Sequence, residues 1–384
     1  MMANFLKAYR KVSGLFYWMR IFPLLLISSV AIADPFELKH GGNLMRLHGN
    51  YAGAQQVYEQ LVTRYPEDAI GYVFNLNTML ILLTWDRNQT RFDDQIRQDA
   101  ASTFDICERT IANEFNNYLA YYYCGQAHMT MSYLSAIRGE YYQSGRHANL
   151  AIKQLERTLK LNENLVDAKM HLGIAYYHAD HLPPFLKALS WFLWFIPTGN
   201  ADKSLPYLEA TTNSGYFFKD VAKFLHADLL IMEGDLQKAS DLLKALSETY
   251  PGNSRVRLRY ISLLLEQALY EKTISVGQQF LSEQHQDIDE DLVRLWITRA
   301  HLALNAVDKA KDTFNTINLK IEQNDDLPPW GLHWLLLTRG QIADLDNRRN
   351  DALQNYQRII DEDHYVNPVI LTMARKGIED PFRQ

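Results

Sequence analysis

The chain has 384 residues, of which 47% are hydrophobic and 12% aromatic, and its formal net charge is −6 at pH 7. Its 18 glycines, 12 prolines and two cysteines are too few for a disordered, collagen-like or disulfide-dense protein. An acidic chain also lacks the basic face that nucleic acids require, so we expect no nucleic-acid partner.

The first 33 residues have the composition of a secretory signal peptide. Residues 1–33 contain four basic residues and no acidic one, and residues 21–33 form an apolar run that ends in Ala31-Ile-Ala33. These features are typical of a cleaved export signal. The alternative is an uncleaved anchor, but the run is shorter than the ~20 apolar residues that span a bilayer. We expect a start at Met1 or Met19, cleavage after Ala33 and export to a bacterial periplasm.

A second apolar window covers residues 182–197 and includes Trp191 and Trp194. It also contains Lys187 and two adjacent prolines, so we interpret it as a segment packed between helices. The alternative is a helix at a membrane interface, where tryptophan favours the headgroup layer. Membrane contact is therefore a secondary expectation.

A small residue recurs along the chain at intervals of 34–53 residues. In several copies an aromatic residue follows four positions later, as Tyr58 follows Ala54 and Tyr356 follows Ala352. Small residues at regular intervals indicate repeated close approaches between helices. The eight positions are Ala54, Ala100, Ala151, Ser204, Ala239, Thr273, Ala310 and Ala352.

The segment Leu172-Gly-Ile-Ala-Tyr-Tyr177, together with these small residues, resembles the tetratricopeptide-repeat family. The resemblance extends over nearly all of the chain after residue 33, and it is strongest over residues 147–180 and 218–280. It implies an all-α fold, namely a right-handed α-solenoid of about eight helix pairs. The structural alternative is a globular helical bundle, which would not require small residues at this interval.

The resemblance divides the mature chain into two continuous halves. Residues 34–215 are expected to form irregular repeats, because their spacing exceeds the usual period and requires longer helices or insertions. Residues 216–384 are expected to form more regular repeats.

Two cysteines, Cys107 and Cys124, lie at equal distances from an expected turn at residues 113–117. Residues equidistant from such a turn face each other on antiparallel helices. An oxidising compartment would permit a disulfide between them. The alternative is a pair of small buried hydrophobic residues, and the sequence leaves both interpretations open.

No sequence motif indicates an enzyme. His178, Asp180 and His181 could be metal ligands, but they fit a polar helix terminus better. The acidic stretch from Asp287 to Asp291 lacks the glycine of a calcium loop, so we interpret it as a helix start. Nucleophile and phosphate-loop motifs are absent from the sequence. We expect no catalytic site, no metal and no cofactor.

The family resemblance implies a concave groove lined by the first helix of each pair. Such a groove suits an extended peptide or an amphipathic helix. The groove positions carried over from the family pattern are Asp167, Met170, Ile174, Tyr177, Phe224, Asp228, Arg255 and Leu258.

The resulting functional hypothesis is a non-catalytic periplasmic scaffold that binds a protein or peptide partner in its groove. The alternative is an accessory protein associated with an envelope glycan or lipid. Tyrosines 121–123, 133, 141 and 142 bear on that alternative, since aromatic faces stack on sugars, although such residues more often fill helix interfaces.

Overall fold

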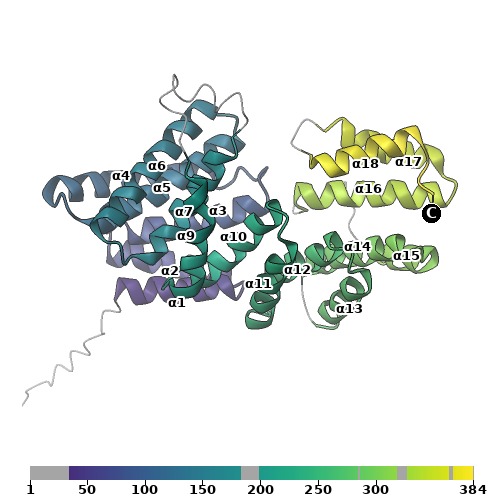
Figure 1. The fold of residues 1–384 in the computed structure, drawn as a ribbon, viewed down its shortest axis with the longest axis horizontal. Coiled ribbons are helices and arrows are strands. Elements are labelled where there is room, and N and C mark those ends of the chain that lie inside the picture. Colours follow the sequence, from purple (N-terminus) through teal and green to yellow (C-terminus); the bar gives the residue numbers. More distant parts are fainter. Residues whose placement is uncertain (1–33, 183–198, 284–285, 318–326, 363–365, 384) are drawn as a thin grey trace, which may run out of the picture. The chain divides into compact units, whose positions relative to one another are not determined.

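The part of the chain that the structure describes consists of α-helices (Figure 1). The computed structural model describes residues 34–182, 199–283, 286–317, 327–362 and 366–383. Within these ranges it contains seventeen helices and no strand. The predicted all-α class is confirmed.

The helices alternate as first and second members of a repeated pair, which we call A and B helices. The A helices are α1 (Pro35–Leu47), α3 (Ile70–Trp85), α5 (Tyr118–Ile137), α7 (Val166–Asp180), α10 (Lys219–Met232), α12 (Ser254–Glu266), α14 (Asp287–Ala303) and α16 (Pro329–Leu345). The B helices are α2 (Tyr51–Arg64), α4 (Asp93–Asn113), α6 (Tyr141–Leu161), α9 (Ala201–Ser214), α11 (Leu236–Thr249), α13 (Tyr270–Leu281), α15 (Val307–Phe314) and α17 (Arg349–Ile360). A further helix, α18 (Pro368–Glu379), packs on α16 and α17. The described helices thus confirm a solenoid of about eight pairs.

Each of the eight recurring small residues lies in a different B helix. All eight side chains are at most 3% exposed, which places them at the contact with a neighbouring helix. A small side chain there lets two helix backbones approach closely, and a larger one would push them apart. The small residues therefore recur in the sequence because each B helix packs closely on a neighbouring helix.

The last repeat shows how little space such a contact leaves. The ring of Tyr356 in α17 lies between Gly340 of α16 and Gly377 of α18. A methyl group on Gly340 would come within 2.5 Å of the ring, and one on Gly377 within 2.6 Å. The Tyr356 hydroxyl donates a 2.9 Å hydrogen bond to the buried carboxylate of Asp344.

The connections between A and B helices share one backbone feature. Six of them contain a residue with positive φ, a conformation that glycine and asparagine adopt at low cost. These residues are Gly49, Gly139, Gly234, Ala268, Asn305 and Asn347. Glycine occupies three of these six positions, where a helix pair reverses direction.

Helix lengths account for the irregular first half. Helices α4, α5 and α6 have 21, 20 and 21 residues, whereas α15 has 8. Long helices in α4–α6 thus contribute to the wider repeat spacing of this half. Asp287 begins α14, as the interpretation of the acidic stretch required.

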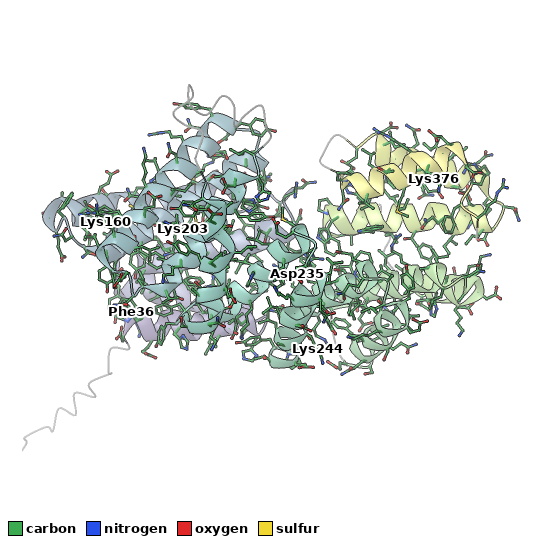
Figure 2. The ribbon with its side chains drawn as sticks, viewed as in Figure 1. Phe36, Lys160, Lys203, Asp235, Lys244 and Lys376 are labelled. Atoms are coloured by element: carbon green, nitrogen blue, oxygen red, sulfur yellow. The ribbon has the colours of Figure 1, made fainter. Side chains whose placement is uncertain are left out.

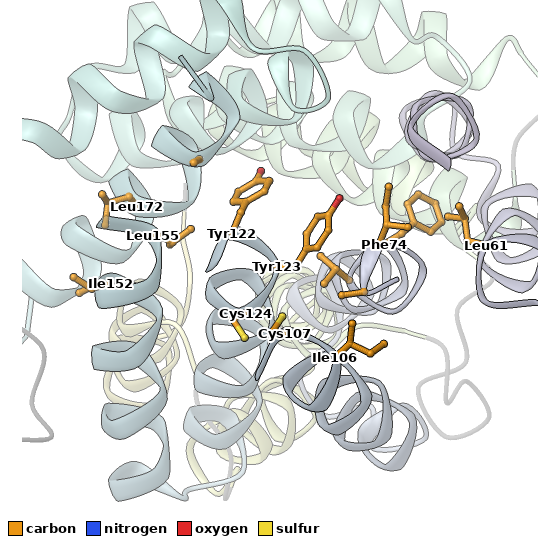
Figure 3. Close-up of a cluster of buried hydrophobic side chains, with 14 of the residues drawn as sticks. Leu61, Phe74, Ile106, Cys107, Tyr122, Tyr123, Cys124, Ile152, Leu155 and Leu172 are labelled. Carbon is orange, nitrogen blue, oxygen red and sulfur yellow. The ribbon is translucent and has the colours of Figure 1, made fainter. Parts of the chain in front are cut away.

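Hydrophobic clusters follow one another along the array. The largest is shared by helices from α2 to α7 and includes Phe74, Tyr122 and Leu155 (Figure 3). A second lies among α12, α13, α14 and α16. This distribution is expected when each pair buries its apolar face on the next pair.

Two expectations fall largely outside the described residues, namely the signal peptide at 1–33 and the apolar window, of which residues 183–197 are not described. None of the described helices is both long enough and apolar enough to cross a membrane.

Candidate functional site

The eight predicted groove residues fall into two groups by exposure. Asp167, Met170, Tyr177 and Leu258 are at most 3% exposed. Ile174, Phe224, Asp228 and Arg255 keep part of their surface accessible to solvent. No partner is present, so their role in binding stays a prediction.

The carboxylate of Asp167 holds a neighbouring chain segment in place. Its carboxylate accepts hydrogen bonds from the backbone N–H groups of Tyr216, Phe217 and Phe218 at 3.0, 2.9 and 3.2 Å. These groups belong to the segment that leads into α10. A buried carboxylate that satisfies several N–H groups fixes a chain segment in place.

Other predicted residues join neighbouring A helices. The Tyr177 hydroxyl donates a 2.7 Å hydrogen bond to Glu233, and its ring stacks on His181 at 3.9 Å. Asp228 forms a 2.8 Å ion pair with Arg259. These contacts connect α7 with the end of α10, and α10 with α12. Much of the predicted set therefore contributes to packing between repeats.

Helix α1 covers part of the same surface. Lys39 is 1% exposed, and its Nζ lies 5.0 Å from the ring centre of Phe217 and 5.2 Å from that of Tyr123. Burial lowers the pKa of Lys39 to about 8. Asn253, at the start of α12, donates a 2.9 Å hydrogen bond to the carbonyl of Leu47. The first helix thus contacts segments near α10 and α12.

The four tryptophans of the described residues lie together. Trp85 and Trp330 meet edge to face with ring centres 5.0 Å apart. Trp296 stacks on Trp330 at 6.2 Å and meets Trp334 edge to face at 5.8 Å. They come from α3, α14 and α16. Trp85, Trp330 and Trp334 retain solvent-accessible surface, whereas Trp296 is 3% exposed.

An arginine packs against the Trp85 end of these tryptophans. The guanidinium of Arg255 lies 5.0 Å from the ring centre of Trp85 and 4.8 Å from that of Tyr51. It donates a 3.3 Å hydrogen bond to the carbonyl of Ile81. Within the described residues Arg255 has no carboxylate partner.

A second arginine packs against the Trp334 end. The guanidinium of Arg299 lies 3.9 Å from the ring centre of Trp334, and its Nη1 donates a 3.2 Å hydrogen bond to Thr338. Its Nε is buried without a hydrogen-bond partner. Desolvation lowers the pKa of Arg299 to about 9, and no anion among the described residues opposes this effect.

We call these seven side chains the tryptophan–arginine row. They are Tyr51, Trp85, Arg255, Trp296, Arg299, Trp330 and Trp334.

The sequence interpretation found only Arg255 of this row. The predicted groove residue Arg255 lies eighteen residues before Thr273, the small residue of its repeat. Trp334 lies at the same distance before Ala352, the small residue of the last repeat. A second offset of the same pattern, eleven residues, leads from Ala310 to Arg299. The repeat pattern carried to the last two pairs would therefore have identified both residues.

The cysteines lie where the sequence predicted, on α4 and α5. Both are buried free thiols whose sulfur atoms face each other (Figure 3). A hydrogen bond with Cys124, reinforced by burial, raises the pKa of the Cys107 thiol. Oxidation of this pair stays a prediction.

The histidine cluster has other partners. The Nε2 atom of His181 lies 3.3 Å from Oε1 of Glu233. Burial lowers the pKa of His178. The described ranges contain no group of three or more metal-ligating side chains arranged to hold an ion.

The tyrosines divide between core and surface. Tyr121, Tyr122 and Tyr123 are at most 7% exposed, whereas Tyr141 is 75% and Tyr142 49% exposed. The buried three contribute to the helix interfaces, and the exposed pair lies at the start of α6.

One comparison with known proteins finds a repeat of two helices near the start of the described residues. A family model of the tetratricopeptide repeat matches residues 38–68, which span most of α1 and α2. None of the curated proteins matches the chain.

Solved structures with a likeness to this chain are distant in sequence. The thermophilic tetratricopeptide-repeat protein TTC0263 of Thermus thermophilus has 15% identity and a TM-score of 0.38, over 60% of this chain and 100% of its own. The apo form of the quorum sensor NprR from B. thuringiensis has 11% identity and a TM-score of 0.41, over 93% of this chain and 92% of its own. Neither likeness extends to a function.

The matched repeat covers one helix pair, the remaining described pairs repeat its buried small residue, and five of them also repeat the residue with positive φ at the reversal of direction. Residues 38–68 are thus similar to the tetratricopeptide repeat, and the other described helices share its paired, all-α architecture.

Proposed function

We propose that this chain is a non-catalytic, exported scaffold of the bacterial periplasm, which binds a protein or peptide partner through the tryptophan–arginine row. Tetratricopeptide-repeat proteins are in general interaction scaffolds, which supports the first part. The acid-free, basic and apolar start of the sequence supports export.

The row is the observation that carries the proposal. Tryptophan, tyrosine and arginine are the residues that most often dominate the binding energy of protein interfaces. Here seven such side chains from α2, α3, α12, α14 and α16 are in contact, and most of them keep accessible surface. An extended partner could contact several of them at once.

Site-specific crosslinking tests the binding surface. A photo-crosslinking amino acid would replace Trp334 in the row, or Lys376, an exposed residue of α18 that serves as the control position (Figure 2). In cells, we expect one protein partner to be crosslinked from position 334 and not from position 376, with mass spectrometry as the readout. No crosslinked protein at position 334, or the same proteins at both positions, would contradict the proposal.

Cell fractionation tests the location. We expect the chain in the periplasmic fraction, with Asp34 as the N-terminal residue on sequencing. Retention of residues 1–33 in the mature protein would contradict cleavage, and a cytoplasmic fraction would contradict export.

The alternative is association with an envelope glycan or lipid, and the exposure of Tyr141 and Tyr142 favours it. Retention of the protein on peptidoglycan or on liposomes, lost in a Tyr141→Ala, Tyr142→Ala variant, would support this alternative. No retention at low salt would eliminate it.

A further inference from the structure

We propose that Arg299, held by Trp334, binds a carboxylate of an acidic polypeptide segment, so that the partner of the row is acidic. This inference rests on the proposed function and specifies the chemistry of its partner. The starting observation is that the described residues provide no counter-anion for Arg299.

Other arginines of the chain show what is missing at Arg299. Arg257 pairs with Glu283, Arg138 with Asp93 at 2.6 Å, and Arg349 with Asp344 at 2.9 Å. Such pairing compensates the cost of removing a guanidinium from water. Arg299 has only the Trp334 ring and the Thr338 hydroxyl among the described residues, although it is desolvated enough for its pKa to fall.

The geometry leaves one part of the guanidinium for a ligand. Its face is covered by Trp334, its Nε is buried, and its Nη1 is engaged by Thr338. The Nη2 group has no hydrogen-bond partner within the described ranges. A carboxylate in the plane of the guanidinium could accept from it, and a flat, stacked arginine is well suited to such recognition.

The arrangement of charges favours a polypeptide as the source of the carboxylate. Arg255 and Arg299 contact opposite ends of the tryptophan series, with apolar rings between them. A polypeptide can present acidic residues on both sides of an apolar segment. Because sugar faces can also stack on indoles, an acidic glycan is included as a competitor in the binding assay below.

A binding assay with defined peptides tests the inference. The probe is a fluorescein-labelled synthetic peptide in which glutamates flank a Leu-Phe-Leu segment, and its counterpart has glutamine in place of glutamate. By fluorescence anisotropy, we expect the purified protein to bind the glutamate peptide at least about tenfold more tightly than the glutamine peptide. Because the protein itself is net acidic, such binding would depend on local cations.

Matched variants locate the contact. We expect Arg299→Gln to weaken binding of the glutamate peptide at least about tenfold, and Arg299→Lys to restore only part of it. Arg348→Gln removes the same charge from an exposed arginine and should leave the affinity unchanged. Because Arg299→Gln also loses the stacking on Trp334, circular dichroism and the melting temperature are recorded to verify that the variant is folded at the assay temperature.

Four outcomes would overturn the inference. They are no binding of the glutamate peptide, equal binding of the glutamine peptide, unchanged affinity in Arg299→Gln, and an equal loss in Arg348→Gln. Competition by polygalacturonate or inorganic phosphate as strong as that by unlabelled glutamate peptide would also overturn it, in favour of a glycan or a free anion.

The two proposals fail in different ways. If position 334 crosslinks a partner that Arg299→Gln still captures, the acidic specificity fails and the scaffold stands. If position 334 crosslinks no protein, the proposed function itself fails.

Discussion

The indole N–H of Trp330, at the start of α16, donates a 3.1 Å hydrogen bond to the backbone carbonyl of Trp85, at the end of α3. The two residues are 245 positions apart in the sequence. Their contact connects the second helix pair with the eighth. In a solenoid stabilised mainly by adjacent repeats, such a contact couples segments that would otherwise unfold independently.

Replacing Trp330 tests this coupling. Trp330→Phe keeps an aromatic ring but removes the donor, so we expect the free energy of unfolding in urea to fall by about 1 kcal/mol. Trp334→Phe is the control, because the Trp334 indole donates no hydrogen bond to any described residue. Equal losses in the two variants would show that the hydrogen bond contributes nothing.

We expect glycine-to-alanine substitutions in α16 and α1 to have opposite effects on stability. Gly340→Ala should lower the free energy of unfolding by about 1–3 kcal/mol, because the new methyl group would overlap the Tyr356 ring. Gly41→Ala, in α1, has open space and should raise stability by about 0.5–1 kcal/mol through helix propensity. Thermal unfolding followed by circular dichroism distinguishes them. A neutral Gly340→Ala variant would contradict the tight packing of the last repeat.

Ala268 is strained at the reversal between α12 and α13. Its φ is 58°, whereas the corresponding turn after α10 uses Gly234. Relief of this strain exceeds the extra entropy that glycine loses, so Ala268→Gly should stabilise the protein by about 0.5–1 kcal/mol. The measurement is the urea midpoint, with Ala245→Gly in α11 as a control that should destabilise.

A buried histidine pair makes stability depend on pH. The Nδ1 atoms of His128 and His147 are 2.9 Å apart, so one ring donates and the other accepts. Burial lowers the pKa of His128 to about 3 and lowers that of His147. The unfolded state therefore binds protons more readily below its pKa of about 6.5.

These pKa values give the sign of the effect. Stability is fully present above pH 6.5 and falls as the pH decreases toward 3, by about 1–2 kcal/mol for His128 between pH 6.5 and 5. His128→Gln should flatten this part of the urea-midpoint profile. A parallel profile in the variant would exclude His128 as a source of the dependence.

The oxidation state of the cysteine pair tests whether the protein is exported to an oxidising compartment. If the protein is exported, we expect Cys107 and Cys124 to form a disulfide, because their thiols face each other in an oxidising environment. Without reductant, the unfolded protein should then resist alkylation, and its intact mass should lack two hydrogens. Alkylation of both thiols in freshly purified periplasmic protein would contradict the disulfide.

The sequence by itself determined the class of fold and its repeat. Residues such as Ala239 and Ala352 recur because every B helix needs a small side chain at its contact, and this requirement is local. The same holds for Asp287 at a helix start and for the turn between Cys107 and Cys124. Contacts between neighbours in the chain leave a regular spacing, which can be recognised without a structure.

Only the tertiary structure decided which residues remain accessible. The repeat pattern predicted both Tyr177 and Arg255 as groove residues. In the structure Tyr177 is buried against Glu233 and His181, whereas Arg255 stacks on Trp85 and keeps accessible surface. The Trp85–Trp330 contact joins segments far apart in the sequence. No periodicity encodes it, because it depends on the accumulated rotation of all the helix pairs between them.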